Sequence, residues 1–150
     1  MRLKFSITLA CTLFLSIIGH SQELRKANSN AVEKYNIENC TNHFNIEKSV
    51  KTSVGYQYWF IPQDFLPDGL TVKMSVVGPG QATHAPHKHD GDEVFYVLEG
   101  TARFFLNGKT ITGGVNTSFY CPNGSEHGIS NADQTQLKYL VIRKYPISAK

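Results

Sequence analysis

The chain has 150 residues, a length that suits a single domain. Hydrophobic residues at 41% and aromatic residues at 11% are too frequent for an intrinsically disordered protein. The formal net charge of +3 gives no case for nucleic-acid binding, which calls for a concentrated basic face.

Residues 1–21 have the layout of a secretory signal peptide. Two basic residues, Arg2 and Lys4, precede an apolar run at 5–18, and small residues follow it. This run is shorter than the roughly 20 apolar residues that a membrane-spanning helix needs, so we expect no stable membrane span after cleavage. Cleavage removes two of the 15 basic residues and none of the 12 acidic ones. The sequence thus predicts a nearly neutral mature protein that is exported, either to the periplasm or out of the cell.

Residues 22–53 are polar and rich in Asn, Glu, Lys and Ser. We interpret them as an N-terminal arm that packs on a body beginning near Val54. Cys40 lies in this arm and Cys121 in the body. An oxidising compartment permits a disulfide between them, but two cysteines do not make a disulfide framework, and the pairing stays open.

Residues 54–150 alternate short runs of β-branched and aromatic residues with turn residues, a texture typical of an all-β sandwich or barrel. The predicted strands are 55–61, 70–77, 93–98, 101–106, 109–112, 116–121 and 137–143. The run at 94–98 is apolar on both faces of its strand. Such strands imply a closed barrel with an outer layer or a partner subunit.

Histidines gather in two short segments of the body. His87 and His89 are two residues apart, so on a strand their imidazoles project from the same face. Glu93 follows closely, and a later strand that carries His127 could complete the same site. Three imidazoles and one carboxylate suit one divalent transition metal, namely iron, manganese, nickel, copper or zinc. The alternative interpretation is a solvated polar turn without a metal.

Residues 87–100, HKHDGDEVFYVLEG, resemble the first motif of the cupin family, which is His-x-His, three or four residues, Glu, six residues and Gly. Residues 122–131, PNGSEHGISN, resemble the second motif, Pro-x-Gly-x-x-His with an Asn after three further residues. The resemblance spans roughly residues 70–143. Gln81 and Asn116 stand where the motifs have glycine, which affects the geometry of loops rather than the ligands.

The resemblance implies an all-β fold, a small antiparallel cupin barrel of the double-stranded β-helix or jelly-roll type. It also implies a metal inside the barrel, held by His87, His89, Glu93 and His127. Many single-domain members of the family are dimers, so the resemblance further implies a homodimer, which the apolar run at 94–98 fits. Four ligands leave one or two positions open on an octahedral metal, and an open position distinguishes a catalytic metal from a structural one. Asn131 of the second motif is expected to make structural hydrogen bonds rather than to bind the metal.

Other site residues are less sharply defined. No general acid or base can be assigned securely: His84 is the nearest candidate, and Glu93 could leave the metal during turnover. Arg103 and Phe105 share one face of a strand and would line the pocket if that face points into the barrel; an arginine that faces solvent is the alternative. Tyr58 is a third pocket candidate, with a place in the core or in an interface as the alternative.

Together these features predict an exported, metal-dependent enzyme that acts on a small oxygen-rich molecule, such as a sugar, a uronate, an organic acid or a phenolic. Dioxygenase chemistry and isomerase or lyase chemistry both suit an open metal. The alternative is a non-catalytic protein that binds a small ligand such as a sugar through its metal. A metal-free storage protein is disfavoured because all four ligand positions are filled.

Overall fold

A computed structural model describes residues 34–66 and 68–145. The predicted signal peptide and the first part of the predicted arm lie outside these residues. The chain divides into two compact units, one that ends at Asn42 and one that begins at His43. In the described part of the first unit, Asn36 and Asn39 close a turn, because the backbone N–H of each donates to the side-chain oxygen of the other.

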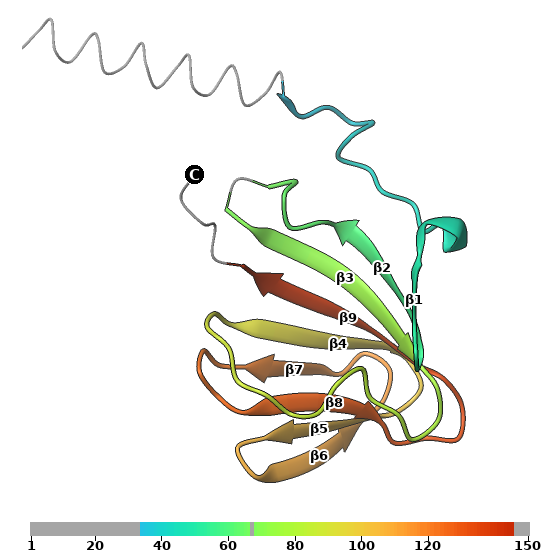
Figure 1. Cartoon of the computed structure of the whole chain (residues 1–150), viewed down its shortest axis with the longest axis vertical. Helices are drawn as coiled ribbons and strands as arrows, with labels where there is room; N and C mark the ends of the chain where they lie inside the picture. Colours follow the sequence, from blue (N-terminus) through green and yellow to red (C-terminus); the bar gives the residue numbers. More distant parts are fainter. Residues whose placement is uncertain (1–33, 67, 146–150) are drawn as a thin grey trace, which may run out of the picture. The chain divides into compact units, whose positions relative to one another are not determined.

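The second unit is built from antiparallel β-strands, as predicted. Its elements are a 3₁₀ helix η1 (Ile46–Lys48) and the strands β1 (Val50–Thr52), β2 (Gly55–Ile61), β3 (Leu70–Val77), β4 (Glu93–Glu99), β5 (Ala102–Leu106), β6 (Lys109–Gly113), β7 (Ser118–Cys121), β8 (His127–Asn131) and β9 (Leu137–Lys144). Figure 1 shows the larger sheet, in the order β1-β2-β3-β9-β4-β7, and the smaller one, in the order β6-β5-β8. Both η1 and β1 come from residues that the sequence assigns to the arm.

The register of the larger sheet aligns a row of polar side chains across four strands. Glu93 of β4 is opposite Cys121 of β7 on one side and Arg143 of β9 on the other, and Arg143 is opposite Thr71 of β3. Side chains of directly paired residues stand on the same face of a sheet. This row meets His127, the first residue of β8 in the smaller sheet, within ion-pair distance of Glu93.

The main hydrophobic core is formed by side chains of both sheets. Its buried members are Val77, Phe95, Val97, Ala102, Phe104, Phe119, Cys121, Ile129, Leu137, Tyr139 and Val141. Phe104 of β5 stacks on Phe119 of β7 with ring centroids 4.8 Å apart, which links the two sheets. Leu137 is fully buried, and its truncation to alanine would cost about 2–5 kcal/mol of stability. Along β9 the core residues precede Arg143, so the polar row lies beside the core at one end of the strands.

A second apolar cluster, formed by Tyr58, Met74 and Val76, covers the opposite face of β2 and β3. The Tyr58 hydroxyl donates a hydrogen bond of 2.8 Å to the backbone carbonyl of His43, and the ring of Phe44 packs edge-on against it at 5.2 Å. Tyr58 therefore has a structural place on the outer side of the larger sheet.

Several turns have a left-handed backbone, among them those at Gly100 and Asn116. Gly100, the last residue of the first motif, has a φ of 80°, and a Cβ there would lie 2.5 Å from the carbonyl oxygen of Gln136. Asn116 stands where the second motif usually has glycine, and its φ is 66°. Asparagine adopts this conformation more readily than most residues, so the departure from the motif preserves the turn.

Two further sequence expectations concern cysteines and membranes. Cys40 and Cys121 are free thiols, the first exposed and the second buried. Within the described ranges, no helix combines the length and the apolar character needed to cross a bilayer.

Candidate metal centre

Backbone hydrogen bonds hold the two histidine motifs together. His87 and His127 form an isolated antiparallel bridge, in which the N–H of each donates to the carbonyl of the other at 3.0 Å. The N–H of Gly124, in the turn before β8, donates to the carbonyl of His89 at 3.1 Å. The loop that carries two histidines is thereby fixed against the turn that delivers the third.

The side chains of the four predicted ligands converge. His87, His89 and His127 each offer a ring nitrogen, and these three atoms all lie within 4.8 Å of one another. Nε2 of His89 is 3.4 Å from Oε2 of Glu93, and Nε2 of His127 is 3.8 Å from Oε1. The side chain of Glu93 and that of His127 are both buried, with residue exposures of 6% and 1%. The structure therefore brings together four residues from a loop and from strands of both sheets.

Backbone carbonyls favour one tautomer of two imidazoles. Nδ1 of His127 lies 2.8 Å from the carbonyl oxygen of Ser125, and Nδ1 of His89 lies 3.2 Å from that of Asp90. Because a carbonyl oxygen only accepts hydrogen bonds, the tautomer that fits these contacts carries its hydrogen on Nδ1 and a lone pair on Nε2. Both Nε2 atoms, and Nδ1 of His87, are buried without a hydrogen-bond partner among the described residues.

The electrostatics of the cluster keep His87 neutral. Burial is the main cause that lowers the pKa of His87 to about 4 from its usual 6.5, and any positive charge on the neighbouring His84, His127, His89 and Arg143 acts in the same direction. The neutral ring therefore predominates at pH 7. Only this neutral form can donate a nitrogen lone pair to a metal.

This arrangement of donors fits a divalent cation. A buried polar atom without a partner costs about 1–3 kcal/mol, and the cluster contains three such ring nitrogens beside a carboxylate. One cation between them would satisfy the nitrogen lone pairs and the carboxylate at once. Mixed imidazole and carboxylate ligands suit transition metals, whereas calcium and magnesium prefer oxygen ligands.

Cys121 adds a buried thiol to the same place. Its sulfur, a carboxylate oxygen of Glu93 and a ring nitrogen of His127 lie within 4.8 Å of one another. Burial, and to a lesser extent the negative charge of Glu93, raises the pKa of the Cys121 thiol to about 12. The thiol thus stays protonated, a form that is a weak ligand and a poor nucleophile.

Two basic residues beside the cluster belong to neither motif. Nη1 of Arg143 is 3.9 Å from Oε2 of Glu93, and its Nη2 donates to the carbonyl of Asp90 at 3.3 Å. Lys73 is close enough that the charges of Glu93 and Arg143 both act on its pKa. Sequence reasoning missed both residues, because only the pairing of β3, β9 and β4 brings them to the motif residue Glu93.

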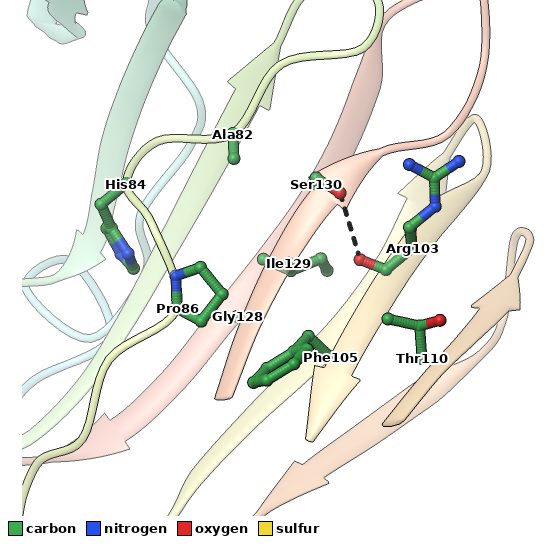
Figure 2. Close-up of a pocket in the computed structure, with 9 residues that line it drawn as sticks. All are labelled: Ala82, His84, Pro86, Arg103, Phe105, Thr110, Gly128, Ile129 and Ser130. Carbon is green, nitrogen blue, oxygen red and sulfur yellow. Dashed lines mark hydrogen bonds between the residues drawn. The ribbon is translucent and has the colours of Figure 1, made fainter. Parts of the chain in front are cut away.

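Arg103 and Phe105 lie elsewhere. Figure 2 shows a pocket on the outer face of the smaller sheet, where residues 82–86 pass β5 and β8, and both side chains line it together with His84. Along β5 they alternate with buried residues such as Phe104, so they point away from the barrel interior. None of the four predicted metal ligands lines this pocket. The strand's alternation thus places Arg103 on the solvent side, which was the alternative expectation.

His84 connects the outer pocket to the cluster. Its ring packs edge-on against that of His87 at a centroid distance of 4.4 Å, and its Nδ1 lies 3.0 Å from the carbonyl oxygen of Ala85. His84 is exposed, so it meets solvent while it contacts a predicted ligand. Tyr58, in contrast, does not line the outer pocket and belongs to the apolar cluster on the other side of the larger sheet.

Asn131, the last residue of the second motif, makes structural hydrogen bonds. Its buried amide donates to the carbonyls of Gly78 at 3.0 Å and Thr135 at 2.6 Å, and its oxygen accepts from the N–H of Asp133 at 2.8 Å. These bonds tie the end of β8 to the loops after β3 and before β9.

Residues 73–143 match the family model described as the cupin domain, Cupin_2. Two curated proteins are similar to part of the chain. The oxalate-binding protein of Thermotoga maritima is 33% identical over 57 residues, which are 37% of this chain and 47% of that protein. Mannose-1-phosphate guanylyltransferase of Salmonella typhimurium is 33% identical over 72 residues, 48% of this chain and 15% of that protein. The matched segment thus spans less than half the length of either relative.

Solved structures resemble the fold. KdgF from Halomonas sp. is 18% identical with a TM-score of 0.59, and the match covers 71% of this chain and 94% of that one. The polyketide cyclase RemF of Streptomyces resistomycificus is 20% identical with a TM-score of 0.58, covering 69% of this chain and 79% of that one. A predicted oxalate decarboxylase of Thermotoga maritima is 22% identical with a TM-score of 0.56, covering 61% and 80%. The domain match shows that residues 73–143 are similar to cupin domains, and these neighbours share the fold, so the predicted all-β barrel is confirmed.

Proposed function

We propose that this chain is an exported metal-dependent cupin enzyme that acts on a small oxygen-rich molecule. His87, His89, Glu93 and His127 would hold one divalent transition metal. The observation that carries the proposal is the convergence of three imidazoles with unpartnered buried nitrogens on one buried carboxylate. Such a donor set is costly to bury unless a cation binds there.

When bound, such a metal polarises a carbonyl or hydroxyl group, and iron, nickel or copper also supports chemistry with dioxygen. The chain's own residues would prepare the site. Ser125 and Asp90 fix the imidazoles of His127 and His89 through their carbonyls, and the buried surroundings exclude water from Glu93. Groups that are already oriented in this way would stabilise charge that develops on the substrate in the transition state.

The reaction class would be either dioxygenase or isomerase/lyase chemistry. The polyketide cyclase and the predicted oxalate decarboxylase among the neighbours are proteins of different named activities on one fold. Fold alone does not select among activities. Turnover that persists under strict anaerobiosis would favour isomerase or lyase chemistry, whereas turnover that requires oxygen would favour the dioxygenase.

A second candidate is a non-catalytic protein that binds a small ligand through its metal. It is favoured by the resemblance to an oxalate-binding protein, whose name describes binding rather than turnover. A protein of this kind would be stabilised by its ligand and would release no product during long incubation with it.

Export and a homodimer also belong to this proposal. The apolar run at 5–18 supports export, and cleavage after residue 21 is measured by N-terminal sequencing of the secreted protein.

The homodimer is supported by two exposed apolar side chains on the outer faces of β4 and β7, Leu98 and Tyr120, which could form a subunit contact. Sedimentation analysis of the purified protein measures whether the dimer forms.

Metal analysis of the purified protein tests the central assignment. We expect about one transition metal per chain in the wild type, and a large loss of metal and of turnover in His87→Ala and His127→Ala with the β-sheet circular dichroism retained. The matched control is His43→Ala, because this exposed histidine lies outside the cluster. If the His127→Ala protein keeps its metal, or if the wild type binds none, the assignment is wrong.

A further inference from the structure

Two basic residues lie beside the four candidate metal ligands, on the face of the larger sheet that carries Glu93. Glu93, Arg143 and Thr71 are paired in one row across β4, β9 and β3. In the next row on the same face, Lys73 of β3 is opposite Val141 of β9 and Trp59 of β2. The barrel wall beside the predicted metal therefore carries two basic side chains on adjacent strands.

Arg143 retains hydrogen-bonding capacity in this position. Its closest approach to Glu93 is 3.9 Å, which is too long for a direct hydrogen bond, and its ring contact with Tyr145 at 4.3 Å holds the guanidinium plane. Its Nε is buried and has no hydrogen-bond partner among the described residues. A planar guanidinium with donors to spare is the side chain best suited to a carboxylate.

Lys73 is a partly buried cation without an acidic partner of its own. No carboxylate of the described residues lies within ion-pair distance of its Nζ, which instead lies 5.1 Å from the centre of the Trp59 ring. Burial lowers the pKa of Lys73, the charge of Glu93 opposes this change, and that of Arg143 adds to it. The positive charge is thus costly here, and an anion at this place would offset the cost.

The positive side chains beside the candidate metal ligands outnumber the negative ones. One carboxylate, Glu93, is shared by the imidazole cluster and Arg143, and Lys73 remains in excess even before a metal is counted. If the two basic residues served only to neutralise Glu93, one of them would suffice. Fixed charges of one sign on a partly buried surface attract an anion.

We propose that Lys73 and Arg143 form an anion subsite that receives a carboxylate group of the substrate next to the metal. The inference rests on the proposed function and narrows its substrate class. Organic acids and uronates carry the required group, whereas neutral sugars and neutral phenolics do not. The carboxylate would contact the guanidinium and the ammonium group, which leaves a neighbouring oxygen of the substrate to face the metal ligands.

Trp59 provides a local signal for the test. It is the single tryptophan of the chain and contacts Lys73, so tryptophan fluorescence reports on this place alone. The purified protein, with and without added manganese, is titrated with sodium D-galacturonate, sodium malonate and D-galactose at constant ionic strength. Galacturonate and galactose differ by a carboxylate, and malonate tests an acid without a sugar ring. Calorimetry repeats each titration independently of fluorescence.

We expect saturable binding of at least one of the two acids. Its affinity should exceed that of galactose at least about tenfold, because one hydrogen bond to a charged group contributes a free energy of this size. Lys73→Met and Arg143→Gln should each weaken acid binding about tenfold or more and leave the metal content unchanged. Arg143→Lys keeps the positive charge but loses the planar guanidinium group, so its affinity for the acid should lie between those of the wild type and Arg143→Gln. Lys109→Met and Arg103→Gln, which alter exposed basic residues of β6 and β5, are the matched controls and should bind as the wild type does.

The outcomes separate this inference from the proposed function. Galactose binding as tight as galacturonate, no binding of either acid, or normal acid binding in both variants overturns the anion subsite, even if the protein holds its metal. Loss of metal from Lys73→Met and Arg143→Lys would also overturn it, because the basic residues would then support Glu93. Acid binding that depends on Lys73 and Arg143 in a wild type that binds no metal would support the subsite and refute the metal-dependent function.

Discussion

Oε1 of Glu93 lies 3.8 Å from Nε2 of His127, although the two residues begin strands of different sheets. Glu93 is fixed by its pairing with Cys121 and Arg143, and His127 by its backbone bridge to His87. The contact therefore joins the two histidine motifs at one buried point. The metal-dependent function that we propose depends on this junction.

Neutralising the carboxylate should weaken metal binding while preserving shape. In Glu93→Gln the amide keeps the volume of the side chain but loses the negative charge that faces His89 and His127. We expect the affinity for manganese or zinc to fall by at least about tenfold, the size of effect seen when groups around a metal are altered. Competition with a metal-sensitive dye measures this affinity. Glu47→Gln in the exposed helix η1 is the control, and equal affinities in both variants would contradict the role of Glu93.

The pKa of His87 predicts how stability depends on pH in the metal-free protein. His87 loses its proton near pH 4 in the folded protein and near 6.5 when unfolded, so between these values the unfolded chain binds more protons. The free energy of unfolding should therefore rise as the pH increases from about 4 to 6.5, and this contribution should be complete above 6.5.

Denaturant unfolding in the presence of a chelator measures this dependence. His87→Asn removes the titrating ring, so its stability should change less over the same pH range than that of the wild type. Identical pH profiles for the two proteins would show that His87 does not have the lowered pKa.

The Cys121 thiol should be unreactive in the folded protein. It is fully buried, and its pKa is raised to about 12, so almost no thiolate is present at pH 8. In a variant with Cys11→Ser and Cys40→Ser, Cys121 is the remaining cysteine. Labelling with a thiol reagent should be negligible under native conditions and complete in denaturant. Rapid native labelling would mean that the cluster is open to solvent.

Asn131 should matter for stability rather than for metal binding. Asn131→Ala leaves the carbonyls of Gly78 and Thr135 and the N–H of Asp133 without their partner. We expect a loss of about 2 kcal/mol or more, since each buried group left unpaired costs about 1–3 kcal/mol. Equilibrium unfolding measures the loss, with the exposed Gln134→Ala as control. An unchanged unfolding midpoint would contradict this role.

The sequence predicts the strands well because β-branched runs and turn residues are local signals. Strands β2 and β3 have the predicted bounds, and Asn116 adopts the left-handed turn expected of the glycine it replaces. The convergence of the four candidate ligands also follows from the motif spacing, although the loop after His89 left the direction of Glu93 open. β1 is three residues long and lies in a polar segment, so composition alone does not reveal it.

The basic residues of the site show where sequence reasoning ends. Arg103 lies on a strand of the smaller sheet whose other face is buried, and a choice between two faces cannot be made without the core that fills one of them. Lys73 and Arg143 reach the cluster because β3 pairs with β9 and β9 with β4. That strand order is a property of the whole sheet, and neither residue has a motif around it.

The most direct test is anomalous scattering from a crystal of the protein grown with manganese or zinc. We predict one strong peak between His87, His89, Glu93 and His127, with nitrogen and oxygen ligands at about 2.0–2.2 Å for zinc. An anomalous peak located only among other residues, or no peak between these four residues at saturating metal, would contradict the metal centre on which the proposed function rests.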